Sequence, residues 1–199
     1  MLWYFIFENK PLLCSRKAGS NSCAEQFERR LSGVDPIQDQ PYRQILRNPL
    51  ERWISGVFHF RRPEVELDRP TQRFLDRGFL LKLRRIPITA KWFLKFYEAV
   101  TEPLERLPGF TDDHFYSQRR HAELVGVNPK RCEEYIPLEA MSLRSKHFPW
   151  LNSQLNRVYL YRKQEIRELV TQSRVEKRLR RLWSWDFEQY QLCSLDWSK

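Results

Sequence analysis

The sequence predicts a single α/β domain with a largely parallel sheet, because two strand-loop-helix units follow one another near its start. The apolar runs Leu2 to Phe7 and Pro11 to Ser15 predict strands, and Tyr42 to Leu46 predicts a third. The chain has 199 residues, of which 41% are hydrophobic, so it can bury a core of its own. Neither a linker nor an internal repeat divides it, and we expect one domain over residues 1–199.

The first predicted helix follows the strand that ends at Ser15. Cys23, Phe27 and Leu31 recur at a spacing of four, which is typical of one helix face. The four residues that begin with Ser22 and end with Glu25 have the form of a capping box. We therefore expect a helix that includes Cys23, Phe27 and Leu31.

The second predicted helix follows the strand Tyr42 to Leu46. Asn48 suits the N-cap position, and Pro49 suits the first helical turn. The residues that would form its apolar face at helical spacing are Leu50, Trp53, Ile54, Val57 and Phe58.

The rest of the chain is mainly helical in pattern. Residues 69–100 are basic and aromatic, and their apolar positions are Phe74, Leu75, Phe79, Trp92, Phe93, Phe96 and Tyr97. Tyr135 to Leu138 predicts one more strand, and Lys163 to Tyr190 predicts one or two helices. The residues expected to face the core in that last segment are Val175, Leu179, Leu182, Trp183, Phe187 and Tyr190.

The charge of the chain indicates an anionic partner. Lys and Arg total 35 against 25 for Asp and Glu, which gives a formal charge of +10. The four cysteines form no C-x-x-C pair, so neither a zinc site nor a secreted disulfide framework is indicated, and a reducing cytosol is the simpler expectation. The N-terminal apolar run is too short for a membrane span, which needs about 20 residues.

The loop from Arg16 to Ser22 is a candidate anion site. Small residues between a strand and a helix present backbone N–H groups at the positive end of the helix dipole. Lys17 adds a cation there, but it precedes the only glycine of the loop, so the loop is not a Walker A motif. The alternative interpretation is a solvated lysine beside a tight turn.

The segment from Arg47 to Ser55 is a second candidate. Arg47 ends a predicted strand, and Ser55 lies two turns into the next helix, off its apolar face. An arginine fork and a hydroxyl in this arrangement can bind a phosphate. The alternative interpretation is a surface cation and a packing residue.

Together the two segments resemble the motifs of sulfotransferases that use 3′-phosphoadenosine 5′-phosphosulfate (PAPS), in the carbohydrate sulfotransferase branch. The first motif of that family, K-x-G-[ST or C]-[ST]-[NS], is matched by Lys17, Gly19, Ser20 and Ser22, with Asn21 where a hydroxyl residue is usual. The second motif, R-[ND]-P-x-x-R-x-x-S, is matched by Arg47, Asn48, Pro49, Arg52 and Ser55.

Two later stretches extend the resemblance over nearly the whole chain. The segment 113–118 is similar to the family pattern D-x-H-W-x-P-Q in shifted form, keeping His114 and Gln118 but with Ser117 where proline is expected. The segment 182–190 resembles the closing helix I-Y-x-x-D-F-x-x-F, with Trp183 in place of the tyrosine.

The resemblance implies a P-loop-like three-layer fold in which helices flank a short, mainly parallel sheet. It implies PAPS as the sulfuryl donor, no metal, and a hydroxyl acceptor of carbohydrate type. Lys17 would be the electrostatic catalyst and His114 the general base, with Glu25, Asp35 and Asp39 as competing bases. The implied cofactor-binding residues are Arg16, Lys17, Ala18, Gly19, Ser20, Asn21, Ser22, Arg47 and Ser55.

Two other functions remain open at this point. A nucleic-acid-binding module would suit the basic and aromatic composition, but it leaves the Lys17 loop unexplained. A nucleotide-binding relative without transfer activity would suit the departures at Asn21 and Ser117. For the leading hypothesis we expect a cytoplasmic enzyme of bacterial or viral type, without a membrane span and without a nucleic-acid partner.

Overall fold

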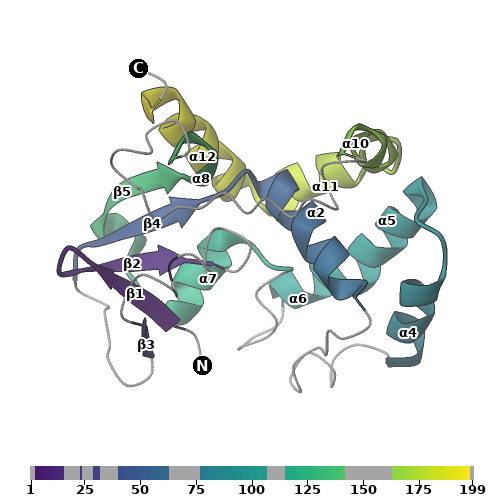
Figure 1. The fold of residues 1–199 in the computed structure, drawn as a ribbon, viewed down its shortest axis with the longest axis horizontal. Helices are drawn as coiled ribbons and strands as arrows, with labels where there is room; N and C mark the ends of the chain where they lie inside the picture. The colour runs from purple at the N-terminus through teal and green to yellow at the C-terminus, as the bar shows by residue number, and fades with distance from the viewer. Residues whose placement is uncertain are drawn as a thin grey trace.

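The protein has a mixed α/β fold in which a five-stranded sheet lies beside a helical body (Figure 1). The computed structural model describes residues 3–15, 23, 29–31, 40–62, 77–106, 115–141 and 163–197. No helix in these ranges is long and apolar enough to cross a membrane.

The sheet has the strand order β3-β1-β2-β4-β5. The strands are β1 (Trp3–Phe7), β2 (Lys10–Cys14), β3 (Arg29–Leu31), β4 (Tyr42–Leu46) and β5 (Cys132–Pro137). β2, β4 and β5 are parallel neighbours, whereas β1 pairs antiparallel with both β2 and β3. Within the described sheet, only β1 therefore runs against the common direction, and the predicted parallel core is confirmed.

Successive side chains along each strand point to opposite faces of the sheet, and both faces are buried. Leu13 and Tyr42 belong to one face and pack with Ala122 of the helix α7 (Gln118–Val125). Leu12 and Ile45 belong to the opposite face, and their cluster includes the helical residue Cys23. Parallel strands buried on both faces are typical of α/β proteins.

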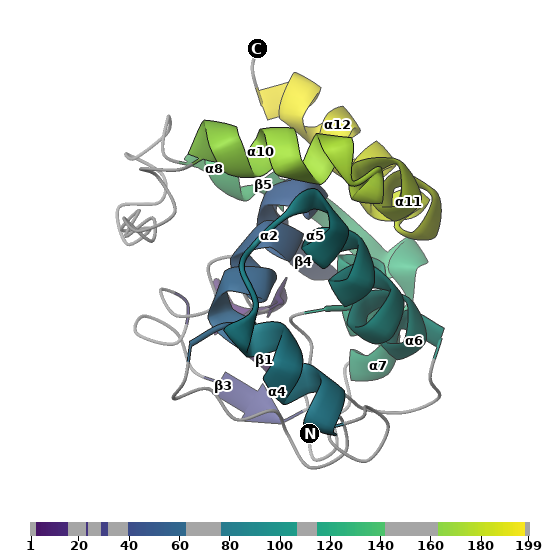
Figure 2. The same ribbon diagram turned by 90° about the vertical axis from the view of Figure 1, so that its right-hand side faces the viewer.

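The described helices other than α7 form two groups (Figure 1), and Figure 2 shows α4, α5 and α10 of the helical body in front of the sheet. Those of the helical body are α2 (Pro49–Phe60), α4 (Arg77–Arg85), α5 (Ala90–Phe96), the π-helix η1 (Tyr97–Thr101), α6 (Glu102–Arg106), α10 (Lys163–Gln172) and α11 (Val175–Leu182). Those beside β5 are the short η2 (Pro129–Arg131), α8 (Leu138–Met141) and α12 (Ser184–Trp197).

An aromatic core holds the helical body together. Trp53 of α2, Trp92, Phe93 and Phe96 of α5, and Phe115 are all at most 1% exposed. The ring pairs include both edge-on and stacked arrangements. Phe60 meets Phe96 edge-on with centroids 5.0 Å apart, and Trp92 stacks on Phe96 at 5.4 Å. α2 connects this core to β4, so the position of the strand end depends on the packing of the body.

The structure confirms the second strand-loop-helix unit, formed by β4 and α2. It corrects the helix of the first unit, which was predicted to include Leu31. Asn48 caps α2 through its side-chain oxygen, which accepts from the backbone N–H groups of Leu50 and Glu51 at 3.1 and 3.2 Å. The predicted helix cannot reach Leu31, because Arg29–Leu31 pairs with β1 as strand β3. Cys23 is helical, Phe27 lies outside the described residues, and at Leu31 a nonlocal pairing decides the conformation.

The C-terminal segment contains three helices where one or two were predicted. Arg174 adopts a left-handed conformation, with φ of 60°, between α10 and α11. Trp183, with φ of −111°, ends α11 and separates it from α12. Val175, Leu179 and Trp183 are buried, as predicted.

Candidate functional site

The carboxyl ends of β2, β4 and β5 meet at one edge of the sheet, which is where α/β proteins commonly bind ligands. The register pairs Cys14 with Ile45, and Ile45 with Ile136. The chain therefore leaves β2 toward residue 16 beside the point where β4 leads into Arg47. The loop Arg16–Ser22, which carries Lys17, Ala18, Gly19, Ser20 and Asn21, lies outside the described residues.

Arg47 is positioned between the end of β4 and the start of α2. Its side chain is 12% exposed, and the next residue, Asn48, caps the helix. Arg52 and Ser55 follow on the stripe of α2 that begins at Asn48. Ser55 is half-buried on that stripe, and no hydrogen bond joins it to Arg47 in the described part of the chain. The structure thus places Arg47 and Asn48 at the positive end of the α2 dipole, whereas Ser55 lies in the second turn of the helix.

Gln118 fixes the backbone of Arg47. Its side-chain oxygen accepts from Arg47 N at 2.9 Å, and its side-chain nitrogen donates to Arg47 O at 3.0 Å. Gln44 adds a third link, since its side-chain nitrogen donates to Gln118 O at 3.2 Å. Gln118 is fully buried, so these contacts replace water around the strand end.

Asp186 in turn fixes the start of α7. Its two carboxylate oxygens accept from the backbone N–H groups of Gln118 at 2.6 Å and Arg119 at 2.9 Å. Complete burial raises the pKa of Asp186, whereas these two hydrogen bonds and the charge of Arg52 act in the opposite direction. A carboxylate at a helix N-terminus also interacts favourably with the dipole.

Arg52 is a fully buried arginine at the centre of this arrangement. Its Nη1 donates to Tyr116 O at 2.7 Å, and its guanidinium lies over the ring of Trp183, 5.9 Å from the centroid. A buried guanidinium is costly unless opposite charge and hydrogen bonds compensate it. Because Arg52 is buried in these contacts, this residue of the second motif has a structural role.

Ser117 has a clear role despite departing from the expected proline. Its hydroxyl donates to Glu105 at 2.6 Å and accepts from Arg120 N at 2.9 Å, which caps α7. Glu105 also accepts from Ser117 N at 2.7 Å and from the indole N–H of Trp183 at 3.1 Å. Two of the three departures of this chain, Ser117 and Trp183, therefore share one carboxylate.

Glu139 was not found by sequence reasoning, yet it contacts the candidate site directly. Its carboxylate accepts from Asn48 N at 3.3 Å and from the Tyr190 hydroxyl at 2.9 Å, and it lies 3.7 Å from Arg47 Nε. Burial raises the pKa of Glu139, and Tyr190, Arg47 and Asn48 oppose that shift. A carboxylate of the chain itself thus faces the Arg47 guanidinium. Only its place one residue after a predicted strand could have drawn attention to it.

The four segments named by the resemblance are brought together only in part. The Arg47 segment, Gln118 and Asp186 form one hydrogen-bonded unit. The proposed base His114 and its competitors Glu25, Asp35 and Asp39 lie outside the described residues. In the described part of the chain no group of three His, Cys, Asp or Glu side chains is placed to hold a metal ion.

Glu105 provides a testable pH dependence. Burial raises its pKa from 4.5 to about 7, although the hydrogen bonds from Ser117 and Trp183 oppose the shift and the charge of Asp186 adds to it. The folded protein therefore binds more protons than the unfolded chain between these pH values, and the free energy of unfolding falls as pH rises through them. We expect Glu105→Gln to remove a contribution of about 2–3 kcal/mol to this fall. Urea unfolding at pH 5 and 7.5 would measure it.

The matched control is Glu123→Gln, which changes a carboxylate that is 38% exposed on α7. We expect its pH profile to follow that of the unmodified protein. Equal profiles for Glu105→Gln and the unmodified protein would contradict the assignment.

No protein-family model matches the chain, and neither does any curated protein or solved structure.

Proposed function

We propose that the protein is a PAPS-dependent sulfotransferase that transfers a sulfuryl group to a hydroxyl of a carbohydrate acceptor. The observation that carries the proposal is the placement of Arg47 at the end of β4, directly beside the parallel strand β2 that leads into the Lys17 loop. Two anion-binding segments that start from neighbouring parallel strands can hold the two phosphate ends of one nucleotide.

The hydrogen-bonded unit around Arg47 supports the same proposal. Gln118 and Asp186 come from the two later stretches of the resemblance. Gln118 contacts the backbone of Arg47, and Asp186 accepts from Gln118 N. The backbone of Arg47 is already fixed at its N–H and C=O groups. Binding a phosphate therefore costs this arginine little further backbone entropy.

Glu139 places a carboxylate next to the proposed 3′-phosphate position at Arg47. Its carboxylate contacts Asn48 N and lies near Arg47, so the donor groups of this position already face an anion. In the proposed complex the 3′-phosphate replaces that carboxylate at Arg47. Burial raises the pKa of Glu139, which makes its negative charge less favourable at this position.

Sulfuryl transfer requires positive charge at the leaving phosphate and a base at the acceptor hydroxyl. In the proposal, the Lys17 ammonium stabilises charge on the bridging oxygen, and the loop Arg16–Ser22 holds the 5′ end. Arg47 and Ser55 hold the 3′-phosphate and thereby discriminate against ATP. His114 is the proposed base, and Glu25, Asp35 and Asp39 remain its competitors. The proposal includes a P-loop-like three-layer arrangement and a cytoplasmic location.

The experiment is a calorimetric titration with 3′-phosphoadenosine 5′-phosphate, the desulfated product, run beside ATP. We expect selective binding of the product, and we expect Arg47→Ala to weaken it about 10- to 100-fold, because a charged hydrogen-bond donor is lost. The matched control is Arg43→Ala, which removes an arginine from the opposite end of the same strand, where it pairs with Glu8 at 2.6 Å.

Two results would overturn the proposal. One is binding of the product no stronger than binding of ATP. The other is an equal loss in Arg47→Ala and Arg43→Ala, since that would indicate general attraction to a basic protein. In either case the basic surface should be tested against nucleic acid.

A further inference from the structure

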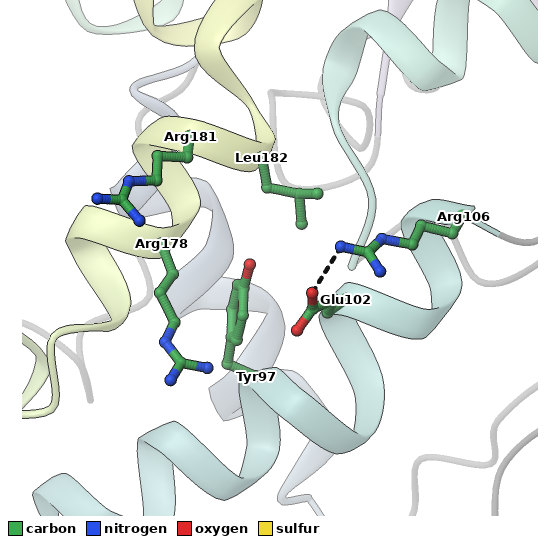
Figure 3. Close-up of a pocket in the computed structure, with 6 residues that line it drawn as sticks. All are labelled: Tyr97, Glu102, Arg106, Arg178, Arg181 and Leu182. Atoms are coloured by element: carbon green, nitrogen blue, oxygen red, sulfur yellow. Dashed lines mark hydrogen bonds and ion pairs between the residues drawn. The ribbon is translucent and has the colours of Figure 1, made fainter.

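A pocket in the helical body gathers arginine side chains from two helices (Figure 3). Its volume is about 360 Å³, within the range of small-molecule sites. None of its lining residues belongs to the Arg47 segment, so it is a separate place on the molecule. They are Tyr97, Glu102, Arg106, Arg178, Arg181 and Leu182.

Tyr97 supplies a polar group to this pocket. It is the first residue of the π-helix η1, and such single turns frequently occur at functional sites. Its ring is buried, and its hydroxyl points into the space between Arg181, Leu182 and Arg106 in Figure 3. Burial, with the charge of Glu102, raises the pKa of Tyr97 to about 12, so the hydroxyl keeps its proton and can donate. Within the described ranges, no hydrogen-bond partner is recorded for that hydroxyl.

The pocket has a surplus of positive charge. Glu102 is compensated by Arg106 at 2.7 Å, and Arg178 pairs with Glu98 at 2.7 Å. Arg181, one helical turn after Arg178, is exposed and has no ion pair with any other described residue. Three arginines and two carboxylates leave one guanidinium, that of Arg181, uncompensated among the described residues, and it lies on the same side of the Tyr97 ring as Arg178 (Figure 3).

We propose that this pocket binds a phosphate or sulfate group, held by the guanidinium groups of Arg181 and Arg178 and by the hydroxyl of Tyr97. Guanidinium groups bind such oxyanions with directed hydrogen bonds. Leu182 and the Tyr97 ring add an apolar surface, which would contact the organic part of an ester. The inference does not depend on the proposed sulfotransferase activity.

The test is an NMR titration of the arginine Nε–Hε signals with inorganic phosphate and, separately, with phenyl phosphate. We expect saturable shifts at Arg178 and Arg181. Arg181→Gln should weaken phenyl phosphate binding about tenfold, as expected for a lost charged hydrogen bond. Tyr97→Phe, which keeps the ring, should weaken it about fivefold. Tighter binding of phenyl phosphate than of inorganic phosphate would identify an ester as the ligand, and equal binding would identify the free ion.

Two control variants separate this site from its alternatives. Arg85→Gln removes an exposed arginine of α4, and we expect it to leave the affinity within about twofold, because it changes only the overall charge. Arg47→Ala should leave the shifts at Arg181 intact, which separates this pocket from the candidate cofactor site. Shifts that do not saturate, or equal losses in Arg181→Gln and Arg85→Gln, would overturn the proposal.

Discussion

Arg52→Met is expected to lower the free energy of unfolding by about 3–5 kcal/mol, because it leaves a buried carboxylate without its opposite charge. Asp186 is fully buried, and the Arg52 charge is one of the influences that hold its pKa down. The variant also leaves Tyr116 O without the donor now at 2.7 Å. Urea unfolding at pH 7 would measure the loss. Since domains are stable by only about 5–15 kcal/mol, this is a large fraction of the total.

A double-mutant cycle separates the charge from the packing of Arg52. Asp186→Asn in the Arg52→Met background should recover part of the loss, because the buried carboxylate is then neutral. Arg43→Met is the control, since its exposed ion pairs contribute about 1 kcal/mol or less. A loss in Arg52→Met no larger than in Arg43→Met would contradict the role given to Arg52.

Lys17→Ala is expected to lower turnover about 10²–10³-fold, because the proposed role of this ammonium is to stabilise charge that develops in the transition state. Binding of 3′-phosphoadenosine 5′-phosphate should fall much less than turnover. Release of that product from PAPS, with a panel of glycan acceptors present, would measure the rate. Lys17 follows β2 by three residues in the sequence, and β2 ends beside β4, which leads into Arg47.

The control for Lys17→Ala is Lys10→Ala at the other end of β2. Lys10 pairs with Glu133 at 2.6 Å and is 42% exposed, so its loss removes the same charge far from the proposed phosphate loop. Equal turnover in Lys17→Ala and the unmodified protein would contradict the proposed catalysis. Product binding without turnover in the unmodified protein would instead identify a nucleotide-binding relative that lacks activity.

Local signals made part of the fold predictable. The strand Tyr42–Leu46 and the helix after Asn48 were identified because the cap, the first-turn proline and the apolar periodicity all agree within a few residues. The strand β5 was identified through its apolar stretch around Ile136.

Nonlocal contacts account for what the sequence did not predict. Leu31 belongs to a three-residue strand whose conformation depends on pairing with Trp3 at the start of β1. Ser117 and Trp183 looked like departures from a motif, and only their shared contact with Glu105 explains both. Glu139 was missed because its role arises from a partner 91 positions away, the backbone of Asn48.

The groups that hold Arg47 in place are far apart in the sequence, so they leave the ribosome at different times. Gln118 lies 71 positions after Arg47, and Asp186 follows Gln118 by a further 68. During synthesis β4 and α2 leave the ribosome long before either partner is available, so the strand end stays open to solvent until α12 emerges. The candidate site is then completed only after most of the chain has been synthesised. A nascent chain halted before residue 186 should retain much of its aromatic core and still lack an ordered Arg47.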